Sequence, residues 1–131
     1  MMTTATYGIG KLVQRPFDET VTRTREALKE QGFGVMCEID VQATMKERLG
    51  VEGDKYVILG ACNPPLAHRA LTAEREIGLL LPCNVIVYET ADGTRVSAID
   101  AELMLGLVGN PELTDVAAEV RERLDSVIDS V

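Results

Sequence analysis

Hydrophobic residues recur along this chain at every second position in some stretches and at every third or fourth position in others. Period two predicts β-strands, and the longer period predicts helices. The stretch Phe33–Val41 alternates cleanly and places Cys37 on its apolar face, where packing is the expected role of the thiol. Residues Tyr7–Gln14 predict an edge or half-buried strand. The run Tyr56–Cys62 is apolar on both faces, which predicts a strand in the middle of the sheet and covered on both sides.

Turn and cap residues separate the remaining elements. Val85–Thr90 and Thr94–Ile99 flank a short Gly-containing turn, so these two strands are expected to pair antiparallel. The helical period, together with proline at helix starts and glycine at helix ends, predicts helices over residues 16–31, 41–49, 64–78 and 101–108, and a last one through residues 113–128. In the helix after Tyr56–Cys62, Asn63 is the expected cap.

The order βαβαβαββαα predicts an α+β fold, a mixed α/β sandwich with helices packed against a single sheet. A length of 131 residues favours a single domain spanning residues 1–131. The most apolar run, residues 77–88, is far shorter than the ~20 residues of a membrane-spanning helix and is broken by Pro82 and Asn84. No membrane association is therefore expected.

Charge and composition narrow the functional classes. With a net charge of −8 and scattered basic residues, the chain would repel phosphate backbones, so nucleic acid is not an expected partner. The start, Met1 to Ala5, has neither a basic segment nor an apolar segment and predicts no signal peptide. A cytoplasmic location follows, in which the three cysteines are expected to be reduced thiols.

The chemically suggestive feature is a repeated Cys-Asn pair. Cys62-Asn63 ends one apolar run and Cys83-Asn84 begins the next. The segment between Gly78 and Cys83 is long enough for an extended return, at ~3.3 Å per residue. We therefore expect antiparallel strands that bring both cysteines and their asparagines to one end of the sheet. Such a corner could hold a thiol pair or half of a soft-metal site, or the cysteines could simply be small buried hydrophobes.

The single histidine, His68, lies in the first turn of the helix that follows Cys62-Asn63 and is expected near the rim of this corner. It could serve as a base or metal ligand there, or it could be an ordinary solvated residue. Asn63 and Asn84 are either caps and corner residues or polar groups of a ligand pocket. Two prolines at the helix start and the lack of a glycine-rich loop disfavour a nucleotide site. No catalytic residue or cofactor is assigned.

Several motifs resemble the family called domain of unknown function 302. They are residues 58–64, 77–85, 32–35, 38–41 and 98–100, so the resemblance covers most of the chain. The family usually follows its Ile-Asp pair with proline, whereas Ala101 stands here. The resemblance implies a small mixed α/β domain that is dimeric, and it brings no established activity.

The sequence thus supports two functional hypotheses. One is a small-ligand or metal-binding module whose pocket is lined by Cys62, Asn63, His68, Cys83 and Asn84. The alternative is a dimeric structural or accessory protein with no chemistry of its own. A homodimer is expected in either case. The last helix carries a long apolar stripe, and apolar surface in excess of what the sheet covers is usually buried between two subunits.

Overall fold

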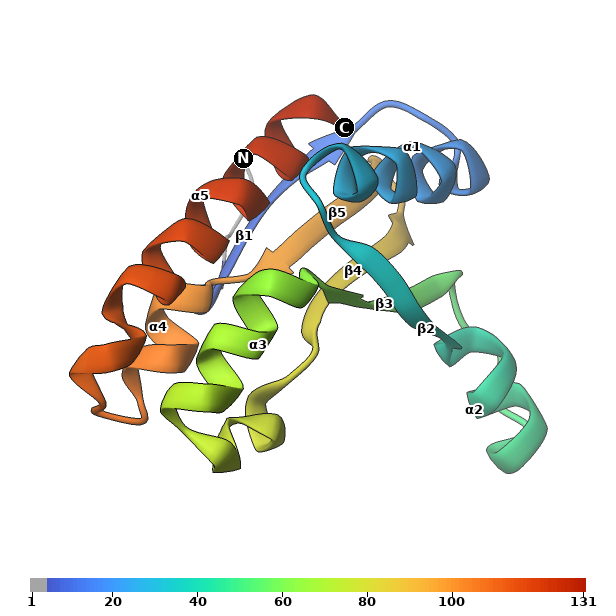
Figure 1. Ribbon diagram of the computed structural model, residues 1–131. Helices are drawn as coiled ribbons and strands as arrows, with labels where there is room; N and C mark the ends of the chain where they lie inside the picture. The colour runs from blue at the N-terminus through green and yellow to red at the C-terminus, as the bar shows by residue number, and fades with distance from the viewer. Residues whose placement is uncertain (1–4) are drawn as a thin grey trace.

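The computed structural model describes residues 5–131 and places five strands in one sheet with the order β1-β5-β4-β3-β2 (Figure 1). The strands are β1 (Gly8–Val13), β2 (Gly34–Asp40), β3 (Tyr56–Cys62), β4 (Cys83–Thr90) and β5 (Gly93–Ile99). Each neighbouring pair is antiparallel, including the predicted β4–β5 hairpin. The predicted α+β class is confirmed.

Helices cover one face of this sheet. They are α1 (Phe17–Glu30), α2 (Val41–Leu49), α3 (Pro64–Ala73), α4 (Ala101–Gly106) and α5 (Thr114–Ser130), with 3₁₀ segments η1 (Arg75–Leu80) and η2 (Pro111–Leu113). In Figure 1, α1, α3 and α5 lie over the same face with α4 beside α5, whereas α2 projects beyond the end of β2.

The core lies between the sheet and these helices. Leu59, Val85 and Val96 point from three adjacent strands into it and are fully buried. The apolar stripe of α5 packs into the same core, with Leu124 and Val127 at 0% exposure. The apolar stripe of α5 is therefore buried against its own sheet, and α5 has no exposed apolar stripe left to form a dimer interface.

The opposite face of the sheet, called the open face below, carries the alternate residues of the same strands. β3 was expected to be covered on both sides, but only Val57, Leu59 and Ala61 enter the core, while Tyr56 and Ile58 are half-buried on the open face. The middle strand is β4, because the β4–β5 hairpin lies between β3 and β1. The expectation that β3 lies inside the sheet is confirmed, because β2 and β4 pair with its two edges, whereas the expected cover on both faces was wrong.

The face that Cys37 occupies was also predicted wrongly. A bulge between Val35 and Cys37 shifts the register of β2 against β3 and breaks the alternation that the sequence displays. As a result, Val35 faces the core, while Cys37 is exposed on the open face opposite Gly60.

Helix α3 ends at Ala73, five residues before the predicted end at Gly78. Asn110 explains the early end, because its side-chain amide donates to the Ala73 carbonyl at 3.2 Å and to Glu74 Oε1 at 3.1 Å. This tertiary contact satisfies the helix terminus, and the chain then continues through η1 and a cis Leu81–Pro82 bond into β4.

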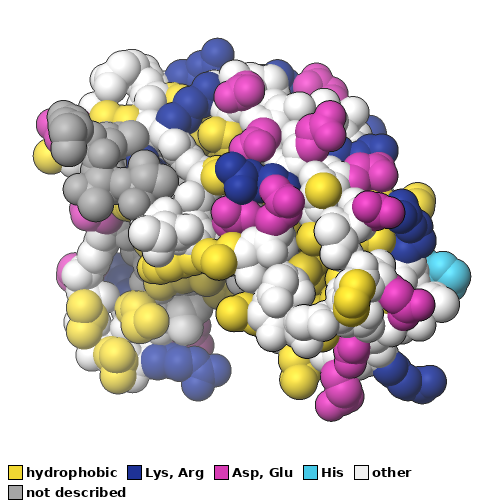
Figure 2. All heavy atoms as spheres, turned by 90° about the vertical axis from the view of Figure 1, so that its left-hand side faces the viewer, with side chains coloured by type: hydrophobic (Ala, Val, Ile, Leu, Met, Phe, Trp, Pro, Cys, Tyr) yellow, Lys and Arg dark blue, Asp and Glu magenta, His cyan; other side chains and the backbone are white. Residues whose placement is uncertain are grey.

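Within residues 5–131, no helix is long and apolar enough to cross a membrane. The prediction of no signal peptide rests on Met1 to Ala5, and of these, Met1 to Thr4 lie outside the described residues. Acidic and basic side chains are interspersed on the side of the molecule seen in Figure 2.

Candidate functional site

The cysteines meet as predicted at one end of the sheet. β3 and β4 run antiparallel with Ala61 opposite Cys83, so the end of β3 at Cys62 adjoins the start of β4. Both cysteines line a cavity of about 350 Å³, called the corner pocket below. Its principal walls are Cys62 and Cys83 at the strand ends, Leu66 and Ala70 on α3, Leu105 on α4, and Val120 on α5.

The thiol of Cys83 is buried and unreactive. Its residue is 6% exposed, and burial, followed by the nearby Cys62, raises the pKa of the Cys83 thiol to about 11. Cys83 is therefore protonated at neutral pH and is a poor nucleophile. Cys62 is half-buried in the pocket wall, and both cysteines are free thiols.

Asn63 lines the pocket but is committed to folding. Its Oδ1 accepts from the backbone N–H of Leu66 at 3.3 Å, so the predicted cap of α3 is confirmed. Its Nδ2 donates to the Gln31 carbonyl at 3.4 Å, and Arg123 donates to the same carbonyl at 2.9 Å. Asn63 therefore joins the end of α1 to the start of α3, and its amide is held by the protein itself.

Two of the predicted site residues lie away from the corner pocket. Asn84 follows Cys83 in the strand and so points to the opposite face of the sheet, where it is exposed in a separate hollow with Tyr88 and Arg95. His68 is exposed on α3 and does not line the pocket, although its neighbour Ala67 does; it is the cyan side chain at the surface in Figure 2. The expected convergence of all five residues is wrong for these two.

The pocket walls favour apolar contacts over metal coordination. Among the described residues 5–131, no group of three or more His, Cys, Asp or Glu side chains is placed to hold a metal ion. The pair Cys62 and Cys83 thus lacks the further His, Cys, Asp or Glu donors that a tetrahedral zinc site needs. Apart from Asn63 and the thiols, the pocket presents aliphatic and aromatic carbon, glycine and methionine.

Sequence reasoning missed the walls that come from the C-terminal half of the chain. Val116 and Val120 were recognised as part of an apolar stripe, but their spacing says nothing about which cavity they border. Leu105 and Pro82 were likewise placed in a helix and a turn without a role in the site. The signal in the sequence was apolar periodicity alone.

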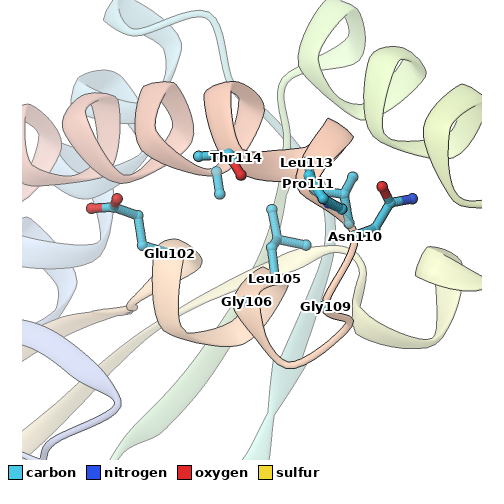
Figure 3. A pocket seen from close by; sticks show the side chains of 9 residues that line it. Glu102, Leu105, Gly106, Gly109, Asn110, Pro111, Leu113 and Thr114 are labelled. Atoms are coloured by element: carbon cyan, nitrogen blue, oxygen red, sulfur yellow. The ribbon is translucent and has the colours of Figure 1, made fainter.

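A second cavity, of about 380 Å³, lies between α4 and the start of α5 (Figure 3). Leu105 lines both this cavity and the corner pocket. The amide of Asn110 points away from it, in agreement with its bonds to Ala73 and Glu74. Asn110 Oδ1 also accepts from the N–H of Glu112, so its polar atoms already have partners within the protein. The corner pocket is therefore the stronger candidate site.

The fold and pocket define the class as a small α+β domain whose helices enclose an apolar cavity at one end of an antiparallel sheet. The chain belongs to the family described as Domain of unknown function DUF302, whose model matches residues 9–131. It is similar to the crystal structure of an uncharacterized conserved protein DUF302 from Bacillus stearothermophilus, with 31% identity, a TM-score of 0.89, and coverage of 96% of this chain and 98% of that chain. A comparison with curated proteins found no match.

Proposed function

We propose that this protein is a binding module for a small apolar organic molecule, which it holds in the corner pocket. The observation that carries the proposal is the lining: an accessible cavity of about 350 Å³ with Leu66, Leu105 and Val120 among its walls. Known small-molecule sites have volumes of roughly 300–1,000 Å³ and are mostly apolar. The cavity is large enough for a compact ring system or a short acyl chain.

Water is a poor occupant of such a pocket. An ordered water needs two to four polar partners, and the pocket offers thiols and an amide that already has partners. An apolar ligand would bury wall carbon that is otherwise in contact with solvent, which is favourable by about 25 cal/mol per Å². The protonated Cys83 thiol supports binding without a covalent step.

Titration with the fluorescent probe N-phenyl-1-naphthylamine tests the proposal. The Ala67→Phe variant places a ring in the pocket wall, whereas His68→Phe adds the same ring at the adjacent exposed position. We expect the wild type and His68→Phe to enhance probe emission equally, and Ala67→Phe to bind the probe at least about tenfold more weakly. Circular dichroism confirms that both variants fold. Equal binding by both variants, or no binding by the wild type, would count against the pocket.

The alternative, a dimeric structural or accessory protein, is supported by one observation. The Asn63 amide serves to join α1 and α3, and the buried Cys83 serves as a small core residue, so neither needs a ligand to explain it. The same titration separates the two hypotheses, because a purely structural domain has no reason to respond to Ala67→Phe. The homodimer itself remains a proposal, and its interface cannot rest on the buried stripe of α5.

A further inference from the structure

Helix α2 lacks a covering partner within its own chain. None of its nine residues is buried, although Val41, Met45 and Leu49 form an apolar stripe at a spacing of four. Met45 is 43% exposed and Leu49 is 70% exposed. Isolated helices shorter than about 12–15 residues are marginal in water, and most are stabilised by packing of an apolar face. The projecting position of α2 in Figure 1 therefore calls for a contact outside the chain.

The open face of the sheet is an apolar surface of the same chain. Cross-strand register places Ile39, Ile58 and Ile86 in one row across β2, β3 and β4. Next to this row, Tyr56 and Tyr88 stack with ring centroids 5.1 Å apart. Among the described strand residues that point to this face, Arg95 is the one charged residue, in a chain with 13 basic and 21 acidic residues.

A hollow connects the two surfaces. It has a volume of about 530 Å³ and lies between α2 and the edge of the open face, lined by Val41, Met45 and Val51 on one side and by Tyr56 and Tyr88 on the other. Asp54 and Glu89 are the charged residues of its lining. The apolar stripe of α2 thus continues onto the apolar row of the sheet. The two form one continuous surface, called the arm-and-face surface below.

We infer that a second copy of this chain covers the arm-and-face surface, with α2 of each copy packed against the open face of the other. A chain of net charge −8 repels its own copy over most of its surface, so self-association is favoured at the open face, where Arg95 is the one charged residue among the described strand residues. A two-fold axis makes the arm-to-face contact twice and leaves neither arm uncovered.

The available area agrees with this arrangement. Five strands spaced about 4.8 Å apart, with about seven residues at 3.3 Å each, span roughly 550 Å². A stable interface buries about 800 Å² on each partner. The sheet alone falls short of this by roughly 250 Å², and the arm, about 13 Å long and 10 Å wide, supplies about half of the difference. The total of roughly 680 Å² lies within the range of about 600–1,000 Å² per partner for standard interfaces. The inference does not depend on a ligand in the corner pocket.

Sedimentation equilibrium from 1 to 100 µM tests the inference on the full chain and on three variants. Met45→Glu and Ile39→Glu introduce a carboxylate into the arm and the face at residues that are already solvent-exposed in one chain. Ala43→Glu adds the same charge to α2 at an exposed position outside the stripe. We expect the wild type and Ala43→Glu to have twice the chain mass of 14.3 kDa. Met45→Glu and Ile39→Glu should raise the dissociation constant on the order of 100-fold, because a carboxylate would be buried without a partner.

Amide hydrogen exchange supplies a second measurement in case a variant alters α2 itself. In the wild type, exchange within residues 41–49 should slow as the protein concentration rises, whereas exchange within α3 should not change. A wild type that stays at 14.3 kDa at 100 µM overturns the inference. This holds even if a different protein is found bound to the same surface, because the inference names a second copy of this chain as the partner. The inference is also overturned if Met45→Glu and Ile39→Glu dimerise with the same dissociation constant as Ala43→Glu.

Discussion

Replacement of Gly60 by alanine probes the strand that leads into the corner pocket. Gly60 lies in β3 opposite Cys37, on the open face. An ideal Cβ built there would stand 2.6 Å from Cys37 Sγ and 2.9 Å from Pro82 Cγ. Both distances are far below ordinary carbon contacts of roughly 3.5–4.0 Å. The methyl group therefore cannot enter unless its neighbours move.

The cost depends on which neighbour moves. Cys37 is exposed and can rotate its thiol toward solvent, but the Pro82 ring is held by its own backbone at the start of β4. Overpacking of this kind costs about 1–3 kcal/mol. We expect Gly60→Ala to lower the free energy of unfolding by about 2 kcal/mol, with roughly half of this due to Cys37.

Urea unfolding followed by circular dichroism measures this in a double-mutant cycle. Cys37→Ala alone should be close to neutral, and in the Gly60→Ala background it should restore about 1 kcal/mol. Gly34→Ala is the matched control, because it lies in the neighbouring strand with no atom within 4 Å of its ideal Cβ. It should change stability by no more than about 0.5 kcal/mol. The packing account fails if Gly60→Ala is as stable as Gly34→Ala, or if the Cys37 and Gly60 effects simply add.

Three further predictions follow from single groups. Because the pKa of Cys83 is raised from 9.0 to about 11 in the folded chain, the unfolded thiol ionises first as pH rises. The contribution of this thiol to the free energy of unfolding is thus fully present below pH 9 and is lost between about pH 9 and 11, by up to about 3 kcal/mol. Urea unfolding at a series of pH values should therefore show a steeper loss of stability over this range for the wild type than for Cys83→Ala. Asn63→Ala should lower the free energy of unfolding by about 1–2 kcal/mol in the same assay, because it removes the cap of α3 and the bond to Gln31; an unchanged midpoint would refute that role. Gel shifts at low salt should show no binding of duplex or single-stranded DNA, given the net charge of −8, and salt-sensitive binding would contradict this.

Much of the fold could be predicted because local patterns and tertiary structure agree. The β4–β5 hairpin follows from its turn residues, and the antiparallel pairing of β3 and β4 follows from the length of the return before Cys83. The predictions failed where a distant residue or a local irregularity determines the end of a helix or the direction of a side chain. Asn110 ends α3 early, and the bulge in β2 turns Cys37 outward; neither can be read from periodicity.

The candidate site was only partly predictable for a similar reason. Cys62, Asn63 and Cys83 were placed correctly, because strand ends and helix caps are encoded locally. Asn84 was misplaced because adjacent strand residues point to opposite faces, and within β4 this turns Asn84 away from the pocket that Cys83 lines. The walls formed by Leu105 and Val120 require knowledge of how α4 and α5 pack, which no local pattern supplies.

Native mass spectrometry of the protein purified from its own cells tests the central claim most directly. The corner-pocket account predicts a non-covalent adduct of small-molecule mass on the wild type that organic solvent removes. His68→Phe should retain the adduct, and Ala67→Phe should lose it, because only the second ring enters the pocket. A wild type that carries no adduct, or an adduct that Ala67→Phe retains in full, would contradict the claim that this pocket holds an apolar ligand.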